Sequence, residues 1–362
     1  MNEPLKILFT TSEGTLTGAT QSLFYLAEGL AQRGHSVIIA CPHKSLLYGM
    51  LDGSQARRMA VEFKGKFDLA SIRAIRDLIF SEKIDIINAQ QSADRYISIF
   101  AKKLFKLPVK IVHTRRQRPL GSGGAVQRNF YVRNTDKIIV VSESLKRTFV
   151  ESGYPPEHIE AIYNGMHPSF FARADNAKTA ELRDKFTIDR GEVVVGCISR
   201  MKNQEQLVRA MQHLPSHYSL FFAGIEEGIF DELSRKLGLK NRIIYAGIIP
   251  REEVVDFYRL FDVFVLPSTM DGFGLVLVEA MGLGVPVVAT RSQGIIDVLD
   301  GEKNGLWFED GDIEQLAIKI KSVVEDEITR ARLIENGLTA AHKKFTIEKT
   351  IDEYESFFES LI

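Results

Sequence analysis

Short apolar runs rich in β-branched residues alternate with segments of helical periodicity along almost the whole chain. In the segment 19–33, apolar residues recur every three or four positions until Gly34 interrupts the pattern. Five apolar runs occur in the first half, at 7–9, 37–39, 84–87, 110–112 and 138–141. Strands that alternate with helices form parallel sheets with helices on both faces. The alternation therefore predicts an α/β fold.

The alternation stops once and then starts again. Residues 165–192 lack the pattern and contain glycine, proline and polar stretches, as interdomain connections do. Five further apolar runs follow, at 193–195, 220–222, 243–245, 263–265 and 285–288. A chain of 362 residues has room for two domains of roughly 100–200 residues each. We predict two Rossmann-like domains that face each other across a cleft, with ligands at the carboxyl ends of the strands.

The break in the pattern sets the expected domain bounds. We predict an N-terminal domain at 1–168 and a C-terminal domain at 169–345. The tail at 346–362 has apolar residues at helical spacing, among them Tyr354 and Phe358. We expect this tail to form a helix that packs back toward the N-terminal domain.

The two halves of the chain carry opposite net charges. Residues 1–172 contain 23 Lys and Arg against 15 Asp and Glu, whereas the remainder contains 23 against 32. The excess lies in a span without acidic residues, whose ten basic residues are Arg95, Lys102, Lys103, Lys106, Lys110, Arg115, Arg116, Arg118, Arg128 and Arg133. This span is either a solvated helix face or a patch for an anionic membrane lipid or a phosphorylated glycan. A nucleic-acid partner is not expected, because no recognisable binding module accompanies the charge.

Several features bear on the compartment. No run approaches the roughly 18 apolar residues of a membrane-spanning helix, and the apolar run near the N-terminus is too short for a signal peptide. Cys41 and Cys197 lie far apart in apparent strands, where we expect buried thiols in a reducing compartment. We therefore predict a cytoplasmic protein, in peripheral contact with the inner face of a membrane if the basic span binds lipid.

The segment 266–290 carries the most chemical information. It combines a buried strand, a turn with Gly272 and Gly274, a short helix and another strand. Glycines let backbone amides approach a ligand, and the helix directs its positive end to the same place, as at diphosphate sites. Asp271 in the turn and Glu279 on the helix add carboxylates that accept hydrogen bonds from paired hydroxyls, as on ribose or hexose. A purely structural turn with a helix-capping acid would have the same spacing.

This segment resembles the signature of the retaining glycosyltransferases of family 4, which have the GT-B fold. The family pattern is Glu-Gly-Phe-Gly, a second Glu eight positions after the first, then Ala-Met and Gly-x-Pro-Val-Val-Ala; here Asp271 replaces the first Glu. The resemblance implies that Glu279 binds the ribose hydroxyls and that Asp271 contacts the donor sugar. It also implies that the backbone of Phe273, Gly274 and Leu275 holds the diphosphate and the sugar. The shorter side chain of Asp271 implies a different sugar or a shifted pose.

A second match to the family opens the C-terminal domain. Arg200 ends a strand and Lys202 follows by two positions, whereas the family places its Lys about five positions after its Arg. The resemblance implies that both cations bind the diphosphate. Two cations stabilise a leaving nucleoside diphosphate without a metal ion, and no metal-binding motif is present in the sequence. An exposed loop with two cations is the alternative interpretation.

The resemblance implies three further positions. Gly18 lies in a turn similar to the family's Gly-Gly-Ala-Glu, where backbone amides would approach a phosphate or the acceptor, although an ordinary turn fits equally. Arg116 stands where the family often has a His beside the transferred sugar, and His113 is the alternative at this place. Ile248, in the loop 247–250, would lie near the nucleotide base.

Taken with the resemblance, these residues predict a metal-independent, retaining glycosyltransferase. The N-terminal domain would bind the acceptor, a lipopolysaccharide core or another cell-surface or lipid-linked glycan. The C-terminal domain would bind the nucleotide sugar, and no cofactor would be needed. A GT-B epimerase or phosphorylase shares the fold, and the departures at Asp271, Arg116 and the shortened loop also fit a catalytically silent nucleotide-binding module. A dinucleotide-dependent oxidoreductase is disfavoured, because the glycines at 14 and 18 lack the Gly-x-Gly-x-x-Gly spacing.

Overall fold

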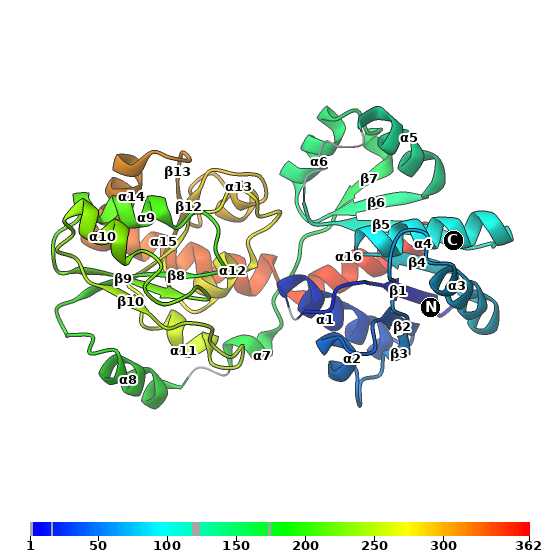
Figure 1. Ribbon diagram of the computed structural model, residues 1–362, viewed down its shortest axis with the longest axis horizontal. Coiled ribbons are helices and arrows are strands. Elements are labelled where there is room, and N and C mark those ends of the chain that lie inside the picture. Colours follow the sequence, from blue (N-terminus) through cyan, green and yellow to red (C-terminus); the bar gives the residue numbers. More distant parts are fainter. Residues whose placement is uncertain (1–2, 16, 118–123, 173–174) are drawn as a thin grey trace. The chain divides into compact units, whose positions relative to one another are not determined.

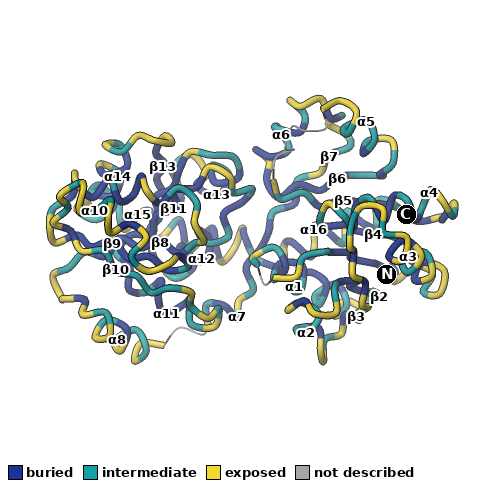
Figure 2. The backbone as a smooth tube through the Cα atoms, viewed as in Figure 1, coloured by how far each residue is buried: buried dark blue, intermediate teal, exposed yellow. Residues whose placement is uncertain are grey.

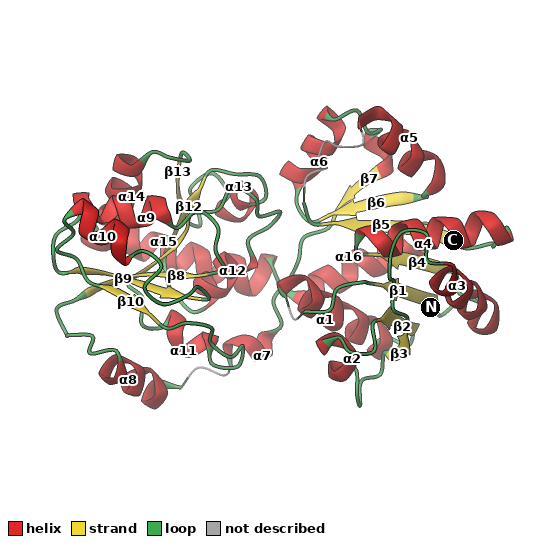
Figure 3. Cartoon of the chain, viewed as in Figure 1, coloured by secondary structure: helices red, strands yellow, loops and turns green. Residues whose placement is uncertain are grey.

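Two parallel sheets, each flanked by helices, make up the protein (Figures 1 and 3). The computed structural model describes residues 3–15, 17–117, 124–172 and 175–362. The chain divides into a first unit, Met1–Gly165 with Ile347–Ile362, and a second unit, Met166–Thr346. The predicted α/β fold with two Rossmann-like sheets is confirmed.

The first unit contains a seven-stranded parallel sheet in the order β3-β2-β1-β4-β5-β6-β7. Its strands are β1 (Lys6–Thr10), β2 (Ser36–Cys41), β3 (Arg57–Ala60), β4 (Ile86–Ala89), β5 (Lys110–Arg115), β6 (Lys137–Val140) and β7 (Ile159–Ala161). Its helices are α1 (Gly18–Gln32), α2 (Leu46–Met50), α3 (Leu69–Glu82), α4 (Ser92–Phe105), α5 (Gly124–Asn134), α6 (Glu143–Glu151), a 3-10 turn at Pro156–His158 and α16 (Ile347–Glu359). The chain reverses its direction of strand addition between β1 and β4, so their carboxyl ends border the site where such sheets bind ligands.

The C-terminal helix α16 completes the core of the first unit. Its buried side chains, which include Ile351 and Phe358, join the cluster formed by Leu23, Leu30 and the inner face of β1 and β2. A Cβ at Gly29 of α1 would lie 2.1 Å from Cδ1 of Ile351. The two helices therefore pack closely where α1 has no side chain. The N-terminal part of the first unit ends at Gly165, where the sequence predicted a boundary at 168. The second unit ends at Thr346, where the sequence predicted 345.

The second unit contains a six-stranded parallel sheet in the order β10-β9-β8-β11-β12-β13. Its strands are β8 (Val193–Ile198), β9 (Tyr218–Ala223), β10 (Ile243–Tyr245), β11 (Val263–Leu266), β12 (Val287–Thr290) and β13 (Leu306–Phe308). Its helices are α7 (Pro168–Phe171), α8 (Asn176–Lys185), α9 (Glu205–Ala210), α10 (Asp231–Leu237), α11 (Val254–Tyr258), α12 (Leu275–Gly282), α13 (Ile295–Leu299), α14 (Ile313–Glu325) and α15 (Glu327–Thr339), with short turns at Met211–His213 and Ala340–Lys344. Both faces of the central strands are buried (Figure 2).

The basic span between Arg95 and Arg133 does not form one continuous patch. Arg95 is buried, and burial lowers the pKa of Arg115 and of Arg116. Lys102 and Lys110 pair with a carboxylate, that of Asp136, and Arg128 donates to the carbonyl oxygen of Ser152. Three cations of the span are exposed: Lys103, Lys106 and Arg133. Arg118 lies outside the described residues. The expectation that the whole span forms one solvated face or one patch is therefore wrong, because five of its ten cations are withdrawn from solvent or paired with Asp136.

Within the described ranges, no helix has both the length and the apolar character needed to cross a membrane.

Candidate active site

The second unit brings its predicted site residues to the place where the strand order reverses. The chain adds β9 and β10 on one side of β8, and then β11, β12 and β13 on the other. Loops at such a switch point diverge, which leaves room for a ligand at the carboxyl ends of the strands. Arg200 and Lys202 follow β8, and Asp271 follows β11. Residues that are about 70 positions apart in the sequence therefore share one site.

Lys202 and Asp271 form an ion pair at this point. The Nζ of Lys202 lies 2.5 Å from Oδ2 of Asp271, and both side chains are partly exposed. Gln204, which is fully buried, holds the loop: its Oε1 accepts from the Lys202 amide at 2.6 Å and its Nε2 donates to the Arg200 carbonyl at 2.9 Å. Arg200 itself is exposed. The shortened loop thus still presents a cation to the turn that carries Asp271.

The turn after β11 leads into α12 through Gly274. Gly274 has φ 82°, a left-handed conformation that residues with a Cβ rarely adopt. The N-cap residue Gly274 has no side chain with which to cap α12, and the first turn of the helix contains no acidic residue. Leu275 begins the helix. Phe273 is buried against Phe345, with ring centroids 5.4 Å apart, so only its backbone is available to a ligand.

The loop after β12 packs against the glycine turn that follows β11. A Cβ at Gly294, where φ is 77°, would lie 2.1 Å from the carbonyl oxygen of Gly272. The Ser292 hydroxyl donates to the carbonyl oxygen of Ser268 at 3.0 Å. The loops that follow β11 and β12 therefore pack backbone against backbone, which positions the glycine turn for a ligand.

Glu279 lies one turn into α12 and is nearly enclosed. It is 3% exposed, and its Oε1 forms an ion pair with Arg251. Its Oε2 accepts a hydrogen bond of 2.8 Å from the hydroxyl of Tyr258. Burial, followed by the charge of Glu279, raises the pKa of Tyr258 well above its ordinary value, so this hydroxyl remains a donor. A carboxylate has about four acceptor positions, so two remain for a ligand.

The loop that contains Ile248 follows β10. Ile248 is 91% exposed, and the carbonyl oxygen of the preceding Gly247 accepts a hydrogen bond of 2.7 Å from the amide of Gly224. That bond joins the loop after β10 to the loop after β9. An apolar side chain held outward at the carboxyl end of the sheet offers a surface for a planar base.

In the first unit, Gly18 begins α1, which follows β1. Thr17 caps the helix: its hydroxyl accepts from the Thr20 amide at 3.3 Å, and the Thr20 hydroxyl accepts from the Thr17 amide at 2.7 Å. Gly18 is exposed beside this cap. The turn is thus structurally satisfied by its own threonines, and Gly18 leaves the backbone open on the solvent side.

Arg116 and His113, the two alternatives for one role, have different surroundings. His113 is 1% exposed and its ring meets the edge of Tyr131, with centroids 5.3 Å apart. Burial lowers the pKa of His113 well below its ordinary value. Arg116 follows the end of β5 and its Nη1 donates to Oε1 of Gln90 at 2.6 Å. Arg116 is thus the more exposed of the two, and its contact with a substrate stays a prediction.

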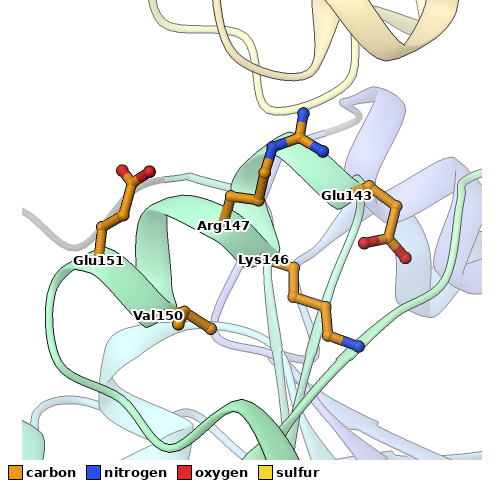
Figure 4. A pocket seen from close by; sticks show the side chains of 5 residues that line it. All are labelled: Glu143, Lys146, Arg147, Val150 and Glu151. Carbon is orange, nitrogen blue, oxygen red and sulfur yellow. The ribbon is translucent and has the colours of Figure 1, made fainter.

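A surface hollow of about 300 Å³ lies on α6 of the first unit (Figure 4). Its described lining consists of Glu143, Lys146, Arg147, Val150 and Glu151, all from one face of that helix. Within the described residues no second element supplies polar groups that converge there, unlike at the ends of β8 and β11.

Two family models match the chain. The model described as Glycosyltransferase Family 4 matches residues 16–170, and the model described as Glycosyl transferases group 1 matches residues 180–339. The chain belongs to this glycosyltransferase family. The two matches correspond to the two sheet-containing units, so the family assignment covers both halves of the enzyme.

Relatives and solved structures agree with this assignment. The glycosyltransferase is 24% identical to N-acetyl-alpha-D-glucosaminyl L-malate synthase of Bacillus anthracis, over 82% of this chain and 80% of that protein. It is 27% identical to the lipopolysaccharide core biosynthesis mannosyltransferase LpsB of Rhizobium meliloti, over 81% and 86% of the two chains. The crystal structure of the HepE protein of Anabaena in complex with UDP has a TM-score of 0.85 at 22% identity, covering 98% of this chain and 100% of that one. The fold of the glycosyltransferase is GT-B.

Four residues that contact the predicted site of the glycosyltransferase had no role in the sequence analysis. They are Gln204, Arg251, Tyr258 and Gln90. A glutamine buried beneath a loop has no periodic signature, and Arg251 and Tyr258 reach Glu279 from another helix and its preceding loop. Only the resemblance of the surrounding segment could have drawn attention to them.

Proposed function

We propose that this glycosyltransferase moves a sugar from a nucleoside diphosphate sugar, with retention of configuration, to an anionic or lipid-linked glycan. The observation that carries the proposal is the group at the end of β8 and β11: Lys202, Asp271 and the glycine-led start of α12. A cation, an uncapped helix end and a sugar-binding carboxylate are what the donor's diphosphate and sugar require.

The diphosphate would bind at the start of α12, against the backbone of Phe273, Gly274 and Leu275. Lys202 and Arg200 would neutralise the charge that develops as the bond between the anomeric carbon and the diphosphate oxygen breaks. The acceptor hydroxyl would attack the same face that the diphosphate leaves, and its proton would pass to the departing phosphate oxygen. The new bond then has the configuration of the old one, and no metal ion takes part.

The other predicted residues would hold the rest of the donor. Glu279 would accept from the ribose hydroxyls, and Asp271 would leave Lys202 to bind the donor sugar. Ile248 would contact the base. In the first unit, Gly18 would approach a phosphate or the acceptor, and Arg116 would contact the transferred sugar.

Two observations support the acceptor class. One relative is named N-acetyl-alpha-D-glucosaminyl L-malate synthase, whose product contains the anion malate, and another is named for lipopolysaccharide core biosynthesis. The first unit carries the chain's excess of positive charge. An anionic acceptor would be attracted by that charge.

Thermal shift with a panel of nucleotides tests the donor assignment. Purified protein is heated with UDP, GDP, ADP, CMP, NAD and the common sugar conjugates, with and without EDTA. A ligand at about 100 times its Kd should stabilise the folded protein by about 2.7 kcal/mol. We expect one nucleoside diphosphate to raise the melting temperature whether or not EDTA is present.

The other outcomes of the panel are equally informative. A rise that EDTA removes would contradict metal independence, and a flat panel would favour a silent module. An activity assay with the donor that the panel identifies separates the other enzymes of this fold. Release of free nucleotide without any acceptor or phosphate requirement would indicate an epimerase, and a strict requirement for inorganic phosphate would indicate a phosphorylase.

We also propose that the first unit touches an anionic membrane through α3 and α4. Four large apolar side chains are exposed there or just before α3, those of Phe67, Leu69, Phe80 and Leu104. Phe67, which precedes α3, stacks on Phe100 of α4 with ring centroids 5.4 Å apart, and the exposed Lys103 and Lys106 lie at the C-terminal end of α4. Exposed apolar groups beside cations are typical of membrane contacts.

Sedimentation with vesicles that contain anionic lipid tests this contact. Each cation near such a surface is worth about 1 kcal/mol. Reversal of both charges, Lys103→Glu with Lys106→Glu, should therefore weaken vesicle binding more than tenfold, and salt should weaken it in the unchanged protein. Lys240→Glu, an exposed reversal in the second unit, should have little effect. Binding that ignores both salt and the double reversal would contradict the proposal.

A further inference from the structure

A chain of hydrogen bonds joins five polar side chains at the carboxyl ends of β4 and β5 in the first unit. Arg116 Nη1 donates to Gln90 Oε1 at 2.6 Å, and Gln90 Nε2 donates to Asn88 Oδ1. Thr114 Oγ1 also donates to Asn88 Oδ1, at 3.0 Å, and lies 3.2 Å from the hydroxyl of Tyr354 on α16. Figure 1 places β4, β5 and α16 together in this unit.

This network contains more donors than acceptors. Its side-chain acceptors are the amide oxygens of Gln90 and Asn88 and the hydroxyl oxygens of Thr114 and Tyr354, and both amide oxygens and one hydroxyl oxygen already accept a hydrogen bond within the network. Two of its nitrogens, Nδ2 of Asn88 and Nε of Arg116, are buried without a hydrogen-bond partner among the described residues. Asn88 is fully buried. Buried polar groups in native proteins nearly always have a partner, so two orphan donors in one network indicate an absent acceptor.

The network also has an uncompensated positive charge. No ion pair of the described residues includes Arg116. The charge of Asp94 acts to raise the pKa of Arg116. The Asp94 carboxylate already accepts hydrogen bonds, however, from the Thr10 and Ser12 hydroxyls and from the backbone amides of Gln90 and Gln91. The neighbouring Arg95 adds a like charge. Arg116 is only partly exposed, and an arginine largely withdrawn from solvent is rarely left without an anionic partner.

We propose that Arg116, Gln90 and Asn88 bind a carboxylate or phosphate group on the sugar side of a substrate, the acceptor or the donor's sugar. Such a group supplies only acceptor oxygens, which is what the network lacks, whereas a sugar hydroxyl would bring a further donor. It also supplies the missing negative charge, and the guanidinium geometry suits two oxygens at once. This inference rests on the proposed transfer reaction and narrows its substrate class.

Calorimetric titration of the full chain with inorganic phosphate is the first test. The donor site is filled beforehand with the nucleoside diphosphate that the panel identifies, so that phosphate cannot bind at Lys202. Phosphate should bind the unchanged protein and bind at least tenfold more weakly to Arg116→Gln. Arg133→Gln, an exposed arginine of the same unit, should leave the affinity unchanged. No phosphate binding, or equal affinity in Arg116→Gln, would overturn the inference.

Two further arms separate the sources of the anion. If the acceptor carries it, glucose 6-phosphate should bind protein filled with the nucleoside diphosphate glucose, and Arg116→Gln should abolish this. If the donor's sugar carries it, Arg116→Gln should weaken the nucleoside diphosphate glucuronate tenfold and leave the glucose conjugate unchanged. Affinity for the nucleoside diphosphate itself should not depend on Arg116. If the unchanged protein did not bind any nucleoside diphosphate, the proposed function would be refuted. If it bound the nucleoside diphosphate but not phosphate, only this inference would be refuted.

The Gln90→Glu variant distinguishes anion binding from a purely structural role of Gln90. The new carboxylate would pair with Arg116 and, after the Asn88 amide turns over, accept from Nδ2. We expect the melting temperature of the empty protein to rise while the affinity for phosphate falls at least tenfold. A lower melting temperature with unchanged phosphate affinity would overturn the proposal.

Discussion

Replacing Lys202 with methionine should lower the kcat for donor cleavage by about 10²–10³-fold, because the departing diphosphate loses a cation that it needs most in the transition state. Methionine keeps a similar stem and removes the charge. Lys202 is placed for this role at the switch point of the second sheet, with its loop held by the buried Gln204. The measurement is the steady-state release of nucleoside diphosphate from the donor that the panel identifies.

The control for this prediction is Lys236→Met, an exposed lysine on α10. It should leave kcat unchanged. The affinity for the nucleoside diphosphate should fall less than kcat in Lys202→Met, since Arg200 and the start of α12 still bind the ground state. A kcat within threefold of the unchanged enzyme would show that Lys202 serves only to pair with Asp271.

The central strands of both sheets could be predicted from the sequence, whereas three edge strands could not. β1, β8 and β11 are buried on both faces and therefore appear as continuous apolar runs. β3 is an edge strand whose four residues are mostly exposed, so no apolar run marks it. β7 and β13 have only three residues each. Runs this short stand out only where every residue favours a strand, as in β10 (Ile243–Tyr245), whereas β7 has Glu160 at its centre.

The candidate site could be predicted where it depends on local geometry. Gly274 needs its left-handed φ for the turn into α12, and the sequence shows both the glycine and the helix that follows. The surroundings of each acid depend on distant contacts instead. Lys202 reaches Asp271 because β8 and β11 are neighbours, and Arg251 reaches Glu279 from the loop before α11. Spacing in the sequence carries no information about such pairs.

The basic span shows the same limit for charge. Ten cations within 39 residues of sequence suggest a single patch. Successive side chains of strand β5 point to opposite faces of the sheet, however, and Arg95 is buried near the start of α4. The charge of a sequence segment therefore does not show which of its cations lie on a surface. The orphan donors of the Arg116 network depend on contacts among β4, β5 and α16, which have no signature in the sequence.

Glu279→Gln should weaken binding of the nucleoside diphosphate about tenfold or more, because a charge-assisted hydrogen bond to the ribose becomes a neutral one. The variant should also lower the free energy of unfolding by about 1–3 kcal/mol, since Arg251 loses its anionic partner while glutamine still accepts from Tyr258. Arg251→Met separates the two effects: it should destabilise the protein similarly and affect the ribose contact less.

A nucleotide without ribose hydroxyls shows whether Glu279 acts where we propose. The unchanged enzyme should bind the ribonucleoside diphosphate at least tenfold more tightly than its 2′,3′-dideoxy analogue, and this preference should be several-fold smaller in Glu279→Gln, where only a neutral hydrogen bond remains. A general loosening of the site would weaken both nucleotides and keep the preference, because the hydroxyls would still find their partner. Calorimetric titration of both nucleotides against both proteins thus closes a thermodynamic cycle, and its coupling energy measures the ribose contact alone. A preference of undiminished size in Glu279→Gln would assign the buried carboxylate to holding Arg251 and Tyr258 in place instead.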